Sequence, residues 1–113
     1  MRYMLQVYFN GAQDNLARLS DAERQAIVDE YIAFFASPEV MDGNQLQPPA
    51  TATTVRVEDT QTLTADGPLA APGESLGGYY VVEAADLDEA VAVAKQVPAR
   101  FGGVEVRPVM VLG

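Results

Sequence analysis

The sequence predicts one ferredoxin-like α+β sandwich over residues 1–113 that pairs with a second copy of itself. A chain of 113 residues has the length of one domain. Its patterns follow the order strand, helix, hairpin, strand, helix, strand, which is the βαββαβ order of this fold with an inserted hairpin. The predicted strands are apolar on both faces, whereas two helices cover only one face of a sheet. We therefore expect a homodimer in which two sheets face each other.

The first strand and the first helix have clear sequence signals. Residues 2–9 alternate with Tyr3, Leu5, Val7 and Phe9 on one face, and Asn10-Gly11 ends the strand. Ser20 and Glu23 form a capping box that begins a helix, which Pro38 ends. Four apolar residues recur at helical spacing, and their type favours the core over a cofactor site. They are Ile27, Tyr31, Phe34 and Phe35.

The middle of the chain is expected to be mostly irregular. Residues 41–44 contain an Asp-Gly-Asn sequence that predicts a turn, and the prolines in residues 46–50 predict an extended segment. Residues 53–57 and 62–65 alternate like two strands of a small hairpin. Because the hairpin is rich in threonine and half polar, we expect it at an edge of the sheet.

The second half repeats the strand, helix, strand order. Gly77 and Gly78 allow close backbone approach where a strand begins, and residues 79–82 are apolar on both faces. Asp86 and Glu89 form a second capping box, so a helix cap is favoured over a metal cluster. Pro98 stops this helix, and residues 104–111 form the last strand. The expected buried stripe consists of Leu87, Ala90, Val91, Ala94 and Val97.

Composition excludes several classes of function. The net charge of −9, with seven basic residues that do not cluster, argues against nucleic acid and anionic membranes as partners. The chain has no His and no Cys, which leaves zinc, iron and copper sites without their usual ligands. We expect no metal and no cofactor. A start that is too short and polar for a signal peptide, and the absence of Cys, favour the cytoplasm.

Asp66 is the first candidate for chemistry, because it lies in a loop between two predicted strands. In a cleft, burial would raise its pKa and suit it to acid–base catalysis. The Asp66-Gly67-Pro68 sequence is equally typical of a turn in which the carboxylate accepts hydrogen bonds from backbone amides. The two roles are compatible, and Gly67 and Pro68 belong to the same candidate site.

Other polar residues near this loop are candidates for ligand binding. Arg56 could bind a ligand carboxylate through two hydrogen bonds, although a surface ion pair with Glu58 is the plainer reading. Arg107 shares one face of the last strand with Glu105, where it is either a ligand group or half of a solvated pair. The glycine pairs lack any phosphate-loop pattern. The remaining candidates are Gln47, Glu74, Tyr79 and Tyr80.

Six segments in this order resemble the YCII-related family, specifically its DGPF branch. They are residues 2–5, 46–56, 66–68, 76–80, 86–90 and 104–110. The resemblance implies a dimeric α/β barrel and no settled activity. More distant family members are thought to hold a His–Asp pair in a cleft, which a chain without His cannot form. Leu69 replaces the usual Phe, and residues 70–73 replace most of the acidic loop that normally follows.

Two functions follow from these observations. The first is a small-molecule-binding dimer with a cleft lined by residues 66–80 and 46–56, where Asp66 would perform any acid–base catalysis. The second is a regulatory or interaction partner without enzymatic activity, because similar proteins are often encoded beside extracytoplasmic-function sigma factors. A deep cleft with convergent polar groups would favour the first, and an exposed apolar patch the second.

Overall fold

The computed structural model describes residues 1–10, 17–69, 74–100 and 102–113. A four-stranded antiparallel sheet has the order β2-β5-β1-β6, and its strands are Val40–Gln45, Glu74–Glu83, Arg2–Asn10 and Gly102–Pro108. Two helices, α2 (Asp21–Phe35) and α3 (Leu87–Ala94), form the crossover connections. This architecture confirms the ferredoxin-like α+β fold.

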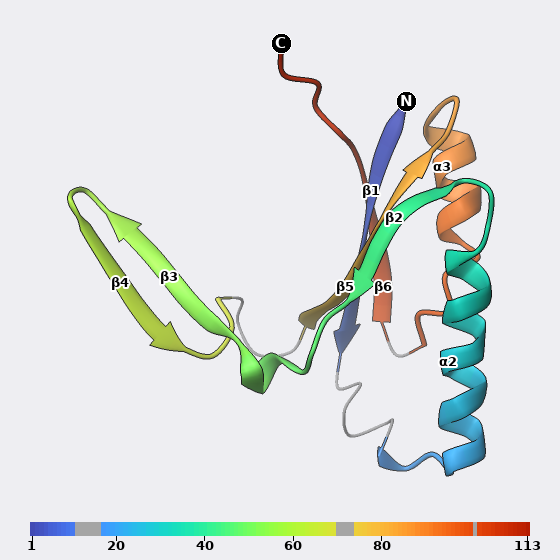
Figure 1. Cartoon of the computed structure of the whole chain (residues 1–113), viewed down its shortest axis with the longest axis horizontal. Coiled ribbons are helices and arrows are strands. Elements are labelled where there is room, and N and C mark those ends of the chain that lie inside the picture. The colour runs from blue at the N-terminus through green and yellow to red at the C-terminus, as the bar shows by residue number, and fades with distance from the viewer. Residues whose placement is uncertain (11–16, 70–73, 101) are drawn as a thin grey trace.

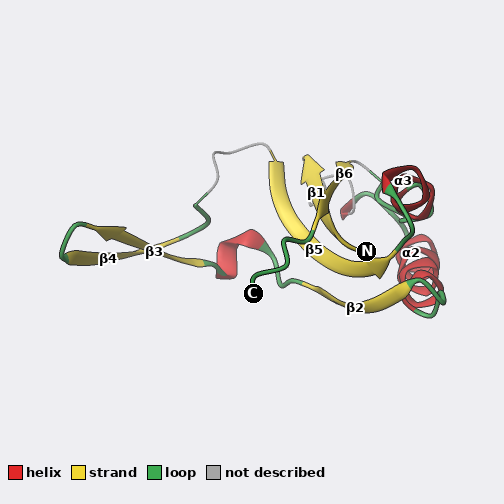
Figure 2. Ribbon diagram, turned by 90° about the horizontal axis from the view of Figure 1, so that it is seen from above, coloured by secondary structure: helices red, strands yellow, loops and turns green. Residues whose placement is uncertain are grey.

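Both helices cover the same face of the sheet (Figures 1 and 2). The alternation in β1 decides which side chains they cover, since Tyr3, Leu5 and Val7 are buried. Leu5 lies opposite Tyr80 of β5 and Val106 of β6, so the three strands contribute to one layer. The buried core comprises Tyr3, Leu5, Val7, Tyr31, Phe34, Tyr80, Val82, Ala84, Ala90, Val93, Ala94 and Val97.

The two predicted helix caps are present. The Ser20 hydroxyl accepts a hydrogen bond from the Glu23 amide at 3.1 Å, and Glu23 Oε1 accepts one from the Ser20 amide at 3.0 Å. Asp86 Oδ1 accepts from the Glu89 amide at 2.9 Å, so this acidic cluster is a cap as predicted. In the portion of the chain described, neither helix has the length and apolarity needed to cross a membrane.

Three local predictions are wrong. Residues 41–44 lie within strand β2 rather than in a turn, because their backbone pairs with β5 and Gly43 accommodates the Tyr80 ring. A 3-10 helix, Pro49–Thr51, interrupts the segment predicted to be extended. In α3, Leu87 is 52% exposed and Val93 is buried in its place, because Leu87 is the first residue of the helix.

The inserted hairpin is also placed differently from the prediction. Its strands β3 (Thr53–Glu58) and β4 (Gln61–Asp66) form a separate two-stranded sheet rather than an edge of the main one. We call this hairpin the arm. Figures 1 and 2 show that it projects from the body on the side opposite the helices, with the C-terminal tail on the same side.

The face of the main sheet that the helices leave uncovered is here called the open face. Its side chains follow from the strand register, in which Gln6 lies between Tyr79 and Glu105, and Met4 lies between Val81 and Arg107. Met4, Gln6, Tyr79 and Val81 are half-buried although no helix covers them. The predicted two-faced character of β1 and β5 is therefore confirmed.

Candidate functional site

A cavity of about 1010 Å³ lies between α2 and the β2–β5 side of the sheet. Its floor includes Gly43 and Tyr80, and the segment from Asn44 to Pro49 forms one wall. Apolar side chains dominate the lining, as is usual for sites that bind small organic molecules. They are Phe9, Ile27, Val28, Tyr31, Ile32, Phe35, Leu46, Leu76 and the prolines at 48, 49 and 98.

The composition of α2 accounts for this cavity. Tyr31 and Phe34 are buried against the sheet, as the helical spacing predicts. Val28, Ile32 and Phe35 form a second apolar stripe on the same helix, and they are 48%, 63% and 47% exposed. Because these three residues line the cavity, its outer wall is apolar surface that faces solvent in the single chain.

Two tyrosines provide the polar groups deepest in the cavity. Burial raises the pKa of Tyr31 to about 12, and the neighbouring Tyr80 adds to this effect. Burial also raises the pKa of Tyr80. The hydroxyl of Tyr80 accepts a hydrogen bond from Gln45 Nε2 at 3.5 Å, which lowers this pKa by a smaller amount. Both phenols are therefore neutral near pH 7, and each can donate a hydrogen bond.

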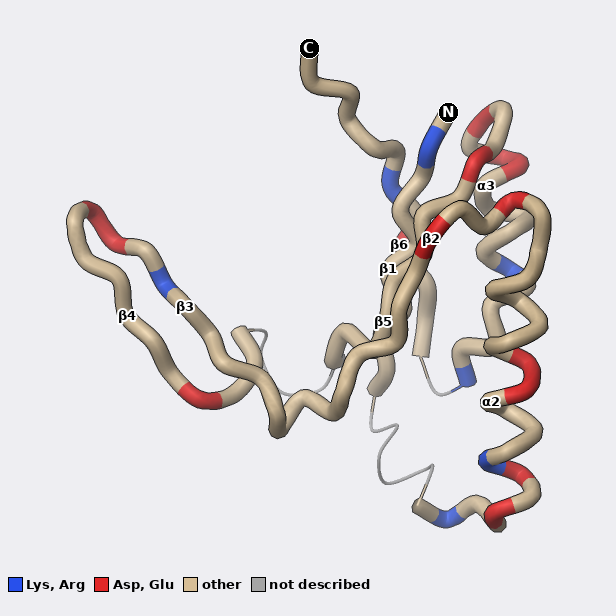
Figure 3. Tube along the Cα trace, viewed as in Figure 1, with Lys and Arg blue, Asp and Glu red and all other residues tan. Residues whose placement is uncertain are grey.

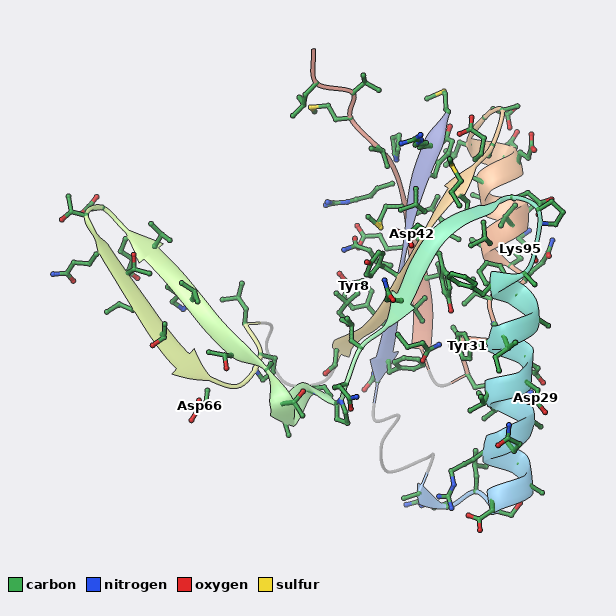
Figure 4. The ribbon with its side chains drawn as sticks, viewed as in Figure 1. Tyr8, Asp29, Tyr31, Asp42, Asp66 and Lys95 are labelled. Atoms are coloured by element: carbon green, nitrogen blue, oxygen red, sulfur yellow. The ribbon has the colours of Figure 1, made fainter. Side chains whose placement is uncertain are left out.

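The Tyr31 hydroxyl has no hydrogen-bond partner among the described residues, although it is buried. Buried polar groups are nearly always paired, because an unpaired one costs about 1–3 kcal/mol. The Tyr31 ring lies between α2 and the sheet (Figure 4), and the residue lines the cavity. Tyr31 is therefore a residue of the cavity lining whose hydroxyl is a donor without a partner among the described residues.

The charges around the cavity contrast with the acidic chain. Among the described residues that line it, no Asp or Glu occurs, whereas Arg24 and Arg100 both do. Arg24 pairs with Asp21 at 2.6 Å and Arg100 pairs with Glu30 at 2.8 Å, and the acidic partners are 98% and 44% exposed. Figure 3 shows acidic residues along α2. Ion pairs this exposed are weak, so an anion could compete for either guanidinium.

Of the candidates from the sequence, Gln47 and Tyr80 line the cavity. Tyr79 points to the open face, where its hydroxyl accepts a hydrogen bond from Asn44 Nδ2 at 3.0 Å. Arg107 is on the same face and pairs with Glu105 at 2.8 Å, with 70% of its side chain exposed. The adjacent tyrosines therefore lie on opposite faces of the sheet.

The base of the arm holds three of the other candidates. Asp66 is the last residue of β4, opposite Thr53, and its carboxylate forms no hydrogen bond with the described residues. The turn depends instead on Gly67, whose φ is +99° and whose amide donates to the Ala52 carbonyl at 2.8 Å. Pro68 follows and is exposed. Figure 4 shows Asp66 apart from Tyr31 and the cavity.

Two further candidates do not take part in the cavity as described. Arg56 is exposed on the arm opposite Leu63, and the ion pairs among the described residues do not include the expected one with Glu58. The Glu74 backbone begins β5, but its side chain lies outside what the structure describes. Asp66, Arg56 and Tyr80 are thus not brought together within one chain.

Sequence reasoning did not identify Tyr31, Gln45 or Arg100 as site residues. Tyr31 was assigned to the core, which is correct for its ring but omits its hydroxyl. A signal was present, because six large apolar residues fall within residues 27–35 of α2, about two and a half turns, where a single buried stripe would need about four or five. They are Ile27, Val28, Tyr31, Ile32, Phe34 and Phe35.

Comparisons with known proteins identify the family of the chain. The sequence model of a family described as YCII-related domain matches residues 1–112. An uncharacterised protein of Rhizobium meliloti is 37% identical over 67 residues, a match that covers 57% of this chain and 54% of the relative. Within the described residues, no group of three or more His, Cys, Asp or Glu is arranged to hold a metal ion.

Proposed function

The chain belongs to the family of YCII-related domains, and we propose that it is a homodimer that binds a small organic molecule in the cavity beside α2. The observation that carries this proposal is the Tyr31 hydroxyl, which is buried at the cavity without a partner among the described residues. A ligand oxygen would provide the missing acceptor. The apolar walls would contribute the larger share of the binding energy.

The lining also suggests the chemistry of the ligand. An apolar body would contact Ile32, Phe35 and Leu46, and an oxygen acceptor would meet Tyr31. The charged side chains in the described lining are Arg24 and Arg100, each in an exposed ion pair with an acid of α2, and their sign favours an anionic group over a cationic one. We therefore propose a small, largely apolar carboxylate or a similar oxygen-bearing molecule as the ligand class.

Octanoate is a suitable first probe, with octanol and octylamine of equal chain length as comparisons. Calorimetric titration should rank octanoate first and octylamine last, because only the carboxylate satisfies both Tyr31 and an arginine. Tyr31→Phe should weaken octanoate binding about ten- to hundredfold, since a hydrogen bond to a charged group contributes about 1.5–3 kcal/mol.

Tyr3→Phe is the matched control, because it removes a hydroxyl from another buried tyrosine that is not among the residues lining the cavity, and it should leave binding unchanged. An equal loss in the two variants, or no binding of any of the three probes, would contradict the proposed site. Native mass spectrometry of the purified chain would add the identity of any retained molecule.

The homodimer is supported by the open face, where Met4, Tyr79 and Val81 are only half-buried on a sheet that helices cover on one side only. A second copy placed there would give each sheet two covered faces, as in a dimeric α/β barrel. Sedimentation at about twice the chain mass of 12.1 kDa is expected at micromolar concentration. A folded monomer under those conditions would refute the dimer.

A regulatory role without enzymatic activity is the second candidate. The observation that favours it is exposed apolar surface on the arm, where Val55 is 56% and Val57 is 75% exposed. Such a surface would suit a protein partner, including the suggested sigma factor. Acid–base catalysis by Asp66 and a cytoplasmic location stay predictions. Co-purification from native cells, with and without Val57→Asp, would test a partner.

A further inference from the structure

We propose that the β3–β4 hairpin is a dimerisation arm, whose face with Val55 and Val57 packs on a second copy of this chain seated against the open face. This inference rests on the proposed homodimer and adds the element that completes its interface. Its starting point is that a two-stranded ribbon alone is marginally stable in water, and needs a third strand or a packed layer. The arm has six residues in each strand and forms its own two-stranded sheet.

The strand register divides the arm into two unlike faces. Residues directly opposite each other in an antiparallel pair point to the same side. One face therefore combines Val55 and Val57 with Thr64 and Thr62, and its only charged residue is Asp66 at the base. Val55 is 56% and Val57 75% exposed.

The other face of the arm is polar and charged. Arg56 lies opposite Leu63, and Glu58 lies opposite Gln61. This face carries the charges of Arg56 and Glu58, and its large apolar residue is Leu63, so solvent covers it at lower cost than the valine face, which leaves two β-branched apolar side chains in water. We therefore assign the valine face to the contact and the Arg56 face to solvent.

The direction of the arm selects a second copy as the occupant. Figures 1 and 2 show the arm projecting on the side of the sheet opposite α2 and α3. A copy seated on the open face must therefore lie beside it. The C-terminal tail leaves on the same side, and Val109, Met110, Val111 and Leu112 are 39–87% exposed. The chain thus directs much of its exposed apolar surface toward one neighbour.

The area of the open face supports the same conclusion. With four strands about 4.8 Å apart and about eight residues long, it covers about 500 Å² per copy, or about 1,000 Å² for two copies. Stable interfaces bury about 1,200–2,000 Å² in total. Each arm buries about 200 Å² of its own face and about 200 Å² of the partner, so two arms add about 800 Å². The total buried area is then about 1,800 Å².

The test compares two variants with the same chemical change on opposite faces of the arm. Val55→Asp places a carboxylate in the proposed contact, and Leu63→Asp places one beside Arg56 on the solvent face. The two side chains are exposed to similar extents, 56% and 48%, so both variants should fold. By sedimentation equilibrium, Val55→Asp should raise the dimer dissociation constant at least tenfold and Leu63→Asp less than threefold.

Amide hydrogen exchange gives a second measure within the same proteins. Backbone amides of Thr53–Asp66 should exchange slowly in the wild-type dimer and rapidly in Val55→Asp, because a ribbon without its contact opens easily. Equal effects of the two substitutions would overturn the arm and leave the dimer standing. A monomeric wild-type chain would overturn both proposals.

Discussion

Replacing Tyr31 with Phe should stabilise the unliganded chain and flatten its dependence on alkaline pH. At neutral pH the substitution removes a buried hydroxyl that has no partner among the described residues, while the ring keeps its place in the core. An unpaired buried group costs about 1–3 kcal/mol, so we expect a gain of about 1 kcal/mol. That gain corresponds to an increase in Tm of about 4 °C for a domain of this length.

The alkaline behaviour follows from the pKa of Tyr31, which burial raises to about 12 from its ordinary value near 10. Below pH 10 the phenol is neutral in both the folded and the unfolded chain and adds no pH dependence. Between pH 10 and 12 the unfolded chain loses this proton and the folded chain keeps it. Stability therefore falls as the pH rises, by up to about 3 kcal/mol from this residue.

Urea unfolding of wild type and Tyr31→Phe from pH 8 to pH 12 would measure both effects. Other groups, including Tyr80, whose pKa burial also raises, titrate in both proteins. The difference between the two free energies of unfolding therefore reports Tyr31 together with its coupling to Tyr80. It should be constant to pH 10 and then grow in favour of Phe. Parallel curves above pH 10, or a less stable Phe variant at pH 7, would refute the reasoning.

Two further predictions concern the β2 edge and the base of the arm. Gly43→Ala should destabilise the fold by about 1–3 kcal/mol in thermal or urea unfolding, because a new Cβ would meet the Tyr80 ring and lie 2.7 Å from the Tyr79 carbonyl. A neutral result would mean that the ring moves aside easily. Asp66→Asn and Asp66→Ala should both change the free energy of unfolding by less than about 0.5 kcal/mol, because the exposed carboxylate forms no hydrogen bond among the described residues. If Asp66→Asn keeps the stability of the wild type and still weakens ligand binding or any activity, Asp66 is a site residue. A large loss of stability in either variant would show that Asp66 stabilises the turn.

The sequence predicted correctly those elements that depend on residues close together in the chain. The hydroxyl of Ser20 and the carboxylate of Asp86 begin helices by bonding amides three residues away, so the sequence contains both partners. The two-faced pattern of β1 likewise needs only the period of a strand. Strand β2 was missed because Asp42-Gly43-Asn44 has the composition of a turn. Its extended form depends on hydrogen bonds to β5, more than thirty residues away.

The residues of the candidate site were likewise predicted only in part. Gln47 and Tyr80 were predicted and do line the cavity, whereas Asp66 and Arg56 are carried away on the arm. Asp66 and Arg56 were chosen because they lie in or near the loop at residues 66–80. Their position in the sequence did not reveal that the hairpin leaves the main sheet. Nor did the spacing that placed Tyr31 in the core indicate whether its hydroxyl would find a partner there.

By itself, the sequence determined the fold class, the helix caps, the two apolar faces of the central strands and a chemistry limited to side chains other than His and Cys. Period, capping and composition are local or additive properties, which is why they can be read along the chain. Only the tertiary structure decided that α2 forms one wall of a cavity. It also decided that the side chains of Tyr79 and Tyr80 lie on opposite faces of the sheet. It alone also placed the arm apart from the main sheet. These features depend on which distant segments meet, and that is set by packing over the whole chain.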